Sequence, residues 1–211
     1  MGSGKSAVGR QLAAALQYDF VDSDAKIESV YQKPIREIFK RDGEAAFRDQ
    51  ESYILKQLAQ FRNQVVSTGG GAILRSVNWE FMRTGVVVWL EGAPELFARR
   101  VVADDLSNRP LLSRGSAAKQ KDPEEQYREA LADISRLLDR RRPLYEMADV
   151  AVPLEAAGTG PEKGLGAPIA EVVHRLLLAL ELRLTQDQNL IFREPASEDF
   201  PEAPAPIAAE E

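Results

Sequence analysis

The chain opens with residue types that suit the binding of phosphate. Residues 2–6 read Gly-Ser-Gly-Lys-Ser, the carboxyl-terminal part of the G-x-x-x-x-G-K-[ST] pattern. Glycines let the backbone curl so that successive N–H groups point at phosphate oxygens, and a following helix adds its positive end. Lys5 would bridge the β- and γ-phosphates of ATP, while the Ser6 hydroxyl would bind Mg²⁺. A flexible Gly/Ser terminus is the plain alternative, but an amphipathic helical pattern follows directly, as the motif requires.

Other residues capable of chemistry are spread along the chain in short groups. An Asp-Ser-Asp triplet lies at the carboxyl end of a predicted strand. Parallel α/β sheets bind their ligands at the edge where the carboxyl ends of the strands lie. Arginines and a glycine triplet follow at intervals. The groups are Asp22–Asp24, Phe47-Arg48 with Glu51, Thr68–Gly71, Arg109–Leu112 and Arg140–Tyr145.

Taken in order and at these spacings, the motifs resemble shikimate kinases. The resemblance covers about residues 2–152, and the stretch 78–90 looks most like the cyanobacterial and plastid branch. It implies transfer of the γ-phosphoryl group of ATP to the 3-hydroxyl of shikimate, with Mg²⁺, on the way to chorismate and the aromatic amino acids. The small-molecule substrate would be shikimate, and we expect a monomer.

The resemblance also implies roles for individual residues. Lys5, Asp24 and Arg109 would be catalytic, with Asp24 as the base or orienter of the attacking hydroxyl and Arg109 as the lid arginine. Shikimate would be held by Asp24, Arg48, Arg141 and the backbone N–H of Gly70. Mg²⁺ would be held by Ser6 and, through water, by Asp22. The nucleotide would be bound by Gly2, Ser3, Gly4, Lys5, Ser6, Ala7, Arg100 and Arg109, with Arg100 against the adenine.

General chemistry supports these roles. Guanidinium groups bind a carboxylate bidentately, so paired arginines suit a ring acid better than lysines would. An aspartate beside the acceptor hydroxyl can take its proton as the bond to phosphorus forms. A glycine triplet lets the backbone approach a ligand where a Cβ would intrude.

Each motif also has a structural explanation when it is taken alone. Asp22 and Asp24 could cap a helix, and Arg48 on a helix could be a solvated surface residue. Residues 69–71 could form a tight turn, and residues 140–142 could be the basic end of a helix. Their ordered co-occurrence favours function, because independent accidents would have to agree in identity and in order.

The elements that must position these residues alternate between strand and helix. Strands are expected at 18–21, 64–67, 85–90 and 148–152, with helices between them. This alternation predicts a parallel sheet, and with the resemblance it predicts a P-loop, nucleoside-monophosphate-kinase-like, three-layer α/β/α fold. The first glycine of the motif and the strand before it are not in the sequence, so we expect an amino-terminally truncated chain. One kinase domain is expected over 1–185, with a lid at about 103–123 and a disordered acidic tail over 186–211.

Bulk composition narrows the possible partners. The net charge of −6 argues against binding nucleic acid or membranes through overall charge. The chain has no cysteine, which excludes disulfides and Cys-ligated zinc, and it has no apolar run of membrane-spanning length. We expect a cytoplasmic enzyme in a bacterium or a stromal one in a plastid. The remaining alternatives are another small-metabolite kinase of the superfamily, a non-catalytic shikimate-kinase-like protein and, less favoured, a nucleic-acid-binding ATPase.

Overall fold

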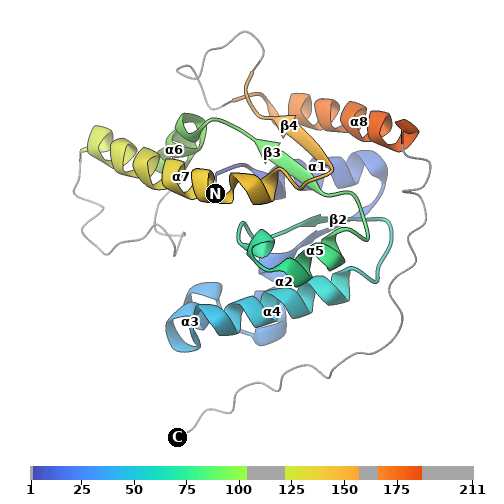
Figure 1. The fold of residues 1–211 in the computed structure, drawn as a ribbon, viewed down its shortest axis with the longest axis horizontal. Coiled ribbons are helices and arrows are strands. Elements are labelled where there is room, and N and C mark those ends of the chain that lie inside the picture. The colour runs from blue at the N-terminus through green and yellow to red at the C-terminus, as the bar shows by residue number, and fades with distance from the viewer. Residues whose placement is uncertain (1, 104–121, 157–165, 187–211) are drawn as a thin grey trace, which may run out of the picture. The chain divides into compact units, whose positions relative to one another are not determined.

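The computed structural model describes residues 2–103, 122–156 and 166–186 (Figure 1). Arg109, most of the expected lid and the expected tail beyond residue 186 lie outside the described residues. The chain divides into two compact units, and the boundary falls inside helix α1 (Lys5–Leu16). The first unit comprises Met1–Leu12 and Val86–Gln186, and the second contains Ala13–Gly85. One domain over 1–185 therefore stays a prediction.

The second unit is built on two parallel strands. β1 (Asp19–Asp22) pairs with β2 (Gln64–Ser67), in a register that sets Asp22 opposite Ser67. Parallel pairing needs a long crossover. The crossover consists of α2 (Ser23–Tyr31), α3 (Ile35–Arg41) and α4 (Gly43–Leu58). After β2 the chain continues through the 3₁₀ turn η1 (Ala72–Leu74) and α5 (Ser76–Met82). Because both strands end at the same edge, the segments that follow them are brought close together.

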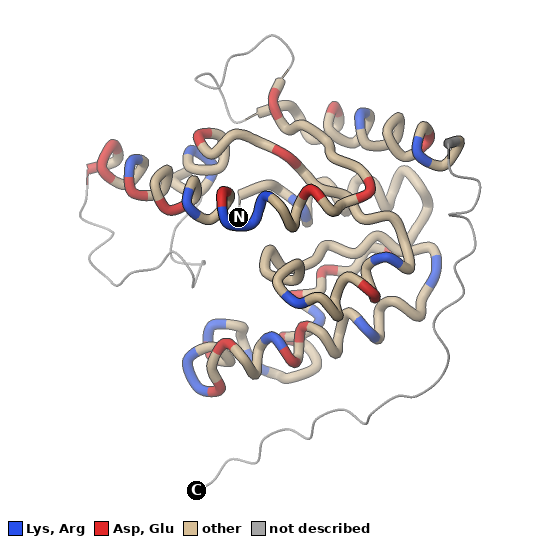
Figure 2. The backbone as a smooth tube through the Cα atoms, in the orientation of Figure 1, with Lys and Arg blue, Asp and Glu red and all other residues tan. Residues whose placement is uncertain are grey.

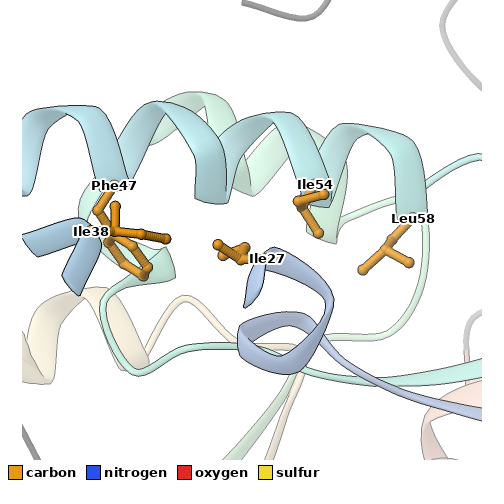
Figure 3. Packing of buried hydrophobic residues seen from close by; sticks show 5 residues of the cluster. All are labelled: Ile27, Ile38, Phe47, Ile54 and Leu58. Atoms are coloured by element: carbon orange, nitrogen blue, oxygen red, sulfur yellow. The ribbon is translucent and has the colours of Figure 1, made fainter. Parts of the chain in front are cut away.

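A small apolar core fixes the crossover helices of this unit (Figure 3). Its members come from α2, α3 and α4, and each is at most 7 % exposed. The three that α4 contributes, Phe47, Ile54 and Leu58, recur at spacings that place them on one helix face. Burying side chains of this size contributes about 1.5–3 kcal/mol each. The other two members are Ile27 and Ile38.

The first unit also contains a parallel pair of strands. β3 (Val88–Glu91) pairs with β4 (Val150–Pro153), with Val88 opposite Val150. Trp89 of β3 stacks on Tyr145, with ring centroids 5.8 Å apart. The helices of this unit beyond α1 are α6 (Pro94–Ala103), α7 (Pro123–Tyr145) and α8 (Ile169–Gln186). α6 packs against α7, and α8 packs against β4 (Figure 1).

Charged residues of both signs are distributed along α7, as Figure 2 shows. Its ion pairs lie at the surface, for example Arg136 with Asp133 at 2.7 Å, so one face of this helix is solvated. Among the described residues, none of the helices combines the length and apolar character that crossing a membrane would require.

Candidate active site

The phosphate loop, residues Gly2–Ser6, has the backbone conformation that its glycines permit. Gly2 and Gly4 have φ values of +71° and +75°, in the left-handed region that other residues avoid. A Cβ on Gly2 would also lie 3.2 Å from the carbonyl oxygen of Phe97, so the loop packs tightly on α6. α1 begins directly at Lys5, and its free N–H groups and dipole favour an anion at this end. The loop and the first turn of the helix thus have the geometry that suits the binding of a phosphate group.

Lys5 and Ser6 occupy the first turn of α1, as the motif requires. Lys5 is half-buried, and its Nζ lies 3.4 Å from the Oγ of Ser3, so the ammonium group folds back over the loop. Ser6 is half-buried as well, whereas Ala7 is exposed. All of the expected phosphate-loop residues therefore lie in one continuous turn of backbone.

Arg100 of α6 reaches this loop from far along the chain. Its Nη1 donates to the carbonyl oxygen of Gly2 at 3.2 Å. A Cβ on Gly166 would lie 2.6 Å from Arg100 Nη2, so the glycine leaves room for the guanidinium. The sequence places Arg100 in the nucleotide site but cannot show this contact, because 98 residues separate the two partners.

The three consecutive arginines near the end of α7 differ in their surroundings. Arg140 is exposed and donates to the carbonyl oxygen of Arg136 at 3.2 Å. Arg142 lies 5.9 Å from the ring of Trp89 and 3.8 Å from both Glu91 and Glu146. Arg141 is half-buried and belongs to the same unit as the phosphate loop. The first and third arginines thus have the structural roles that a basic helix end predicts.

In the second unit, the end of β1 is tied to the end of β2. Asp22 caps α2, since its Oδ1 accepts the N–H groups of Asp24 at 3.1 Å and Ala25 at 3.4 Å. Ser23 is 1 % exposed, and its Oγ accepts the N–H of Gly69 at 3.1 Å. The cap explanation for Asp22 is therefore correct, whatever further role it has. Sequence reasoning missed Ser23, although its place between the two aspartates marked it.

Arg48 is a buried residue and not a solvated one. It is 7 % exposed; its Nη1 donates to Glu51 Oε2 at 2.8 Å and its Nη2 to Glu44 Oε1 at 3.1 Å. Burial by itself lowers the pKa of the guanidinium, but the hydrogen bonds to the two carboxylates outweigh burial and raise that pKa. Arg48 thus stays charged, with its position set by its own helix.

The glycine triplet makes room for charged side chains of the protein itself. A Cβ on Gly69 would lie 2.7 Å from Glu51 Oε1 and 2.8 Å from Asp24 Oδ1, and one on Gly71 would lie 2.3 Å from Arg48 Nη1. A Cβ on Gly70 would meet nothing within 4 Å. The expectation of close approach thus applies to Gly69 and Gly71, with protein groups as the neighbours, whereas a side chain at Gly70 would have space. We refer to Asp24, Arg48, Glu51 and Gly69–Gly71 as the acceptor-side cluster.

The residues assigned to Mg²⁺ fit its chemistry. Mg²⁺ prefers hard oxygen ligands and takes few from the protein, with phosphates and water supplying the rest. Ser6 offers a hydroxyl and Asp22 a carboxylate, in separate units. In residues 2–103, 122–156 and 166–186, no three His, Cys, Asp or Glu side chains gather as a metal cluster.

Comparison with known proteins identifies the family of the chain. The family model described as shikimate kinase matches residues 1–162. Shikimate kinase 2, chloroplastic, of Oryza sativa subsp. japonica is 39 % identical over 189 residues, which are 88 % of this chain and 59 % of the rice protein. Shikimate kinase of Parasynechococcus marenigrum is 45 % identical over 152 residues, which are 72 % of each chain.

Solved structures match as well. Shikimate kinase of Bacteroides thetaiotaomicron has a TM-score of 0.69 at 34 % identity, covering 86 % of this chain and 94 % of its own. Shikimate kinase of Acinetobacter baumannii in complex with shikimate has a TM-score of 0.66 at 34 % identity, covering 87 % of this chain and 90 % of its own. These matches confirm the expected P-loop, nucleoside-monophosphate-kinase-like fold class and the likeness to cyanobacterial and plastid proteins. By its motifs, its fold and these relatives, the chain belongs to the shikimate kinase family.

Proposed function

We propose that this chain transfers the γ-phosphoryl group of ATP to the 3-hydroxyl of shikimate. The observation that carries the proposal is the acceptor-side cluster, in which a buried arginine and an aspartate both lie against the glycine triplet. A phosphate loop alone is shared by many kinases, whereas a buried guanidinium and a carboxylate suit an acceptor that has both an acid group and a hydroxyl.

On the nucleotide side, the chain binds the phosphate groups and neutralises their negative charge. The N–H groups of residues 2–6 and the start of α1 bind the phosphates, and Lys5 neutralises charge on the transferring group. Arg100 stabilises the loop through Gly2, and the resemblance assigns Arg109, which lies outside the described residues, to the transferring phosphates. Mg²⁺, held by Ser6 and Asp22 when bound, supplies further neutralisation of the β- and γ-phosphates.

On the acceptor side, Asp24 orients the attacking hydroxyl and takes its proton, and the N–H of Gly70 binds the substrate. Arg48 and Arg141 hold the shikimate carboxylate. Arg48 has five N–H donors, and one of its two partners, Glu44, is 61 % exposed at the side chain. The contact with Glu44 is the one that a substrate carboxylate replaces, while buried Glu51 keeps the guanidinium in place.

The proposal is tested by turnover with a panel of acceptors. Purified protein with ATP and Mg²⁺ should form ADP and 3-phosphoshikimate with shikimate, and should be much slower with gluconate or nucleoside monophosphates. Preference for another acceptor would assign the chain to a different small-metabolite kinase. Shikimate binding with no turnover would identify a non-catalytic family member.

Lys5→Met should remove transfer but not the binding of the acid. We expect turnover to fall on the order of 10³-fold or more, the effect of a cation that stabilises the transferring phosphoryl group. Shikimate binding, measured by calorimetry, should persist. Lys40→Met, at an exposed lysine of α3, is the matched control and should leave both quantities unchanged. An active Lys5→Met protein would exclude the phosphate loop from the reaction.

The remaining expectations about assembly and location follow from the same proposal. We propose a monomer that acts on a small molecule. The relatives include a chloroplastic rice protein and cyanobacterial proteins, so the proposed compartment is the plastid stroma in a plant or alga and the cytoplasm in a bacterium.

A further inference from the structure

Glu51 is the most deeply buried acidic group among the described residues, and the roles proposed above do not assign it any chemistry. It is 1 % exposed and lies one helical turn after Arg48 on α4. Its Oε2 accepts from Arg48 Nη1 at 2.8 Å. Its Oε1 is buried and accepts no hydrogen bond from any residue that the structure describes. An ionised carboxylate with one oxygen in this state is costly, because buried charge must be paired and hydrogen-bonded.

The second oxygen of Glu51 and a carboxylate oxygen of Asp24 lie near the same point of the backbone, at Gly69. Glu51 Oε1 and Asp24 Oδ1 both lie within 3 Å of the point where Gly69 would carry a Cβ, at 2.7 and 2.8 Å. Two ionised carboxylates at such a site repel each other, and one proton held between them removes the repulsion and supplies the absent donor. The glycine at position 69 is what allows both groups to approach.

The charged groups that act on Glu51 include another carboxylate as well as guanidinium groups. The groups that face Glu51 are Arg48 and, through it, Glu44 on its own helix, Asp24 on α2, and Arg75 just before α5. Arg48 is shared between two carboxylates, and Arg75 is bound at 2.6 Å to exposed Asp49. Arg48 is therefore shared between Glu51 and Glu44, and the negative charge of Asp24 acts on Glu51 as well.

We propose that Glu51 is a neutral carboxylic acid in the folded protein and that its Oε1–H donates a hydrogen bond to Asp24 Oδ1. Glu51 is then a positioning residue, since one of its oxygens fixes Arg48 while the other orients Asp24. Asp24 keeps the negative charge that its proposed role toward the acceptor hydroxyl requires. The inference rests on the proposed function only where it names that hydroxyl.

The electrostatics of the site agree with this assignment. Burial raises the pKa of the Glu51 carboxyl above its ordinary value, the hydrogen bond and charge of Arg48 oppose that rise, and the charge of Asp24 adds to it. A raised pKa means that the folded state keeps the proton to higher pH than the unfolded chain does. The contribution to stability is therefore complete below the ordinary glutamate pKa and is lost as pH rises through the folded-state pKa.

The deciding experiment is a pH titration of glutamate side-chain carboxyl carbons by NMR, with the Glu51 signal assigned by its loss in Glu51→Gln. We expect the Glu51 midpoint above the ordinary range of a glutamate. Glu44→Gln removes the other carboxylate from Arg48 and should leave the Glu51 midpoint raised. If Glu51→Gln does not fold, Asp24→Asn supplies the assignment, because it should lower the midpoint of the Glu51 signal. A midpoint at or below the ordinary range would overturn the proposal.

Two further measurements separate positioning from mere packing. Glu51→Gln mimics the neutral acid, so its free energy of unfolding should exceed that of the wild type increasingly as pH rises through the Glu51 titration. The kcat of the wild type should fall over the same pH range, and the kcat of Glu51→Gln should not. Parallel profiles for the two proteins would contradict the assignment. If no protein phosphorylates shikimate, the proposed function fails, whereas the NMR titration still decides the state of Glu51.

Discussion

At the scale of single residues, the acceptor-side cluster depends on small neighbours as much as on charged ones. Arg48, Glu51 and Asp24 come from two helices, and they fit because Gly69 and Gly71 have no Cβ to obstruct them. The resemblance assigned Gly70 to the substrate and left its two neighbours without roles. The three glycines now divide into two that accommodate protein side chains and one that is open.

Substitution of the triplet by alanine should separate these roles. Gly71→Ala places a methyl group against the Arg48 guanidinium, so it should cost about 1–3 kcal/mol of stability or displace the guanidinium from Glu51. A hydrogen bond to a charged group is worth about 1.5–3 kcal/mol, so the KM for shikimate should rise about tenfold or more, with the KM for ATP little changed. Urea unfolding and steady-state kinetics measure both effects.

Gly70→Ala is the matched control. Its Cβ would meet nothing within 4 Å, so stability should change by no more than about 0.5 kcal/mol, as at an ordinary surface site. A rise in the KM for shikimate in this variant would then result from a clash between the new methyl group and the substrate. Equal stability losses in both variants would contradict the division of the triplet.

At the scale of helices and strands, local pattern was a good guide to position. The strand at Gln64–Ser67 has the expected bounds, and β1 begins one residue later than expected. The strand expected at 85–90 begins only at Val88, because the backbone of Val87 bonds to Asp149, whose side chain accepts the Val87 N–H at 2.8 Å. The N–H of Val87 therefore bonds to a side chain 62 residues away and not to a strand partner, so the strand begins late. No local sequence pattern reveals such a partner.

The burial of Arg48 was hidden from sequence for the same reason. Helical periodicity places Glu44 and Glu51 near it, which is typical of a surface ion pair. Arg48 differs from a residue in a surface ion pair because it is only 7 % exposed and because Gly71 leaves room for its guanidinium. Gly71 belongs to the segment after β2. Sequence pattern predicts elements and motif membership well, whereas contacts between distant segments need the fold.

The first turn of α2 offers a test at this scale, because Asp22 has a structural role and a proposed metal role. Asp22→Ala removes the cap and should cost about 0.5–2 kcal/mol, whereas Asp22→Asn keeps a capping oxygen and should cost much less. If Asp22 also contacts the metal through water, Asp22→Asn should need more Mg²⁺ for half-maximal activity at nearly unchanged stability. Urea unfolding and a Mg²⁺ titration of activity measure the two roles. An unchanged Mg²⁺ requirement would mean that Asp22 only caps the helix and does not contact the metal.

At the scale of the whole molecule, the proposed reaction draws on residues from both compact units. Lys5, Arg100 and Arg141 belong to the first unit, and Asp24 and Arg48 to the second. Helix α1 carries Lys5 at its start and runs on across the boundary between Leu12 and Ala13. A continuous helix transmits order cooperatively along its length, so we expect the two units to unfold together.

Ile27→Ala tests this expectation. Ile27 is fully buried in the core of the second unit, and its truncation should cost about 2–5 kcal/mol. If unfolding is cooperative, the most protected amides of α8, in the first unit, should lose hydrogen-exchange protection by the same free energy as those of α4. Val30→Ala, at a 48 % exposed position of the same helix, should change neither. Loss confined to Ala13–Gly85 would mean that the units fold independently, and the phosphate loop would then stay ordered when the acceptor-side cluster is lost.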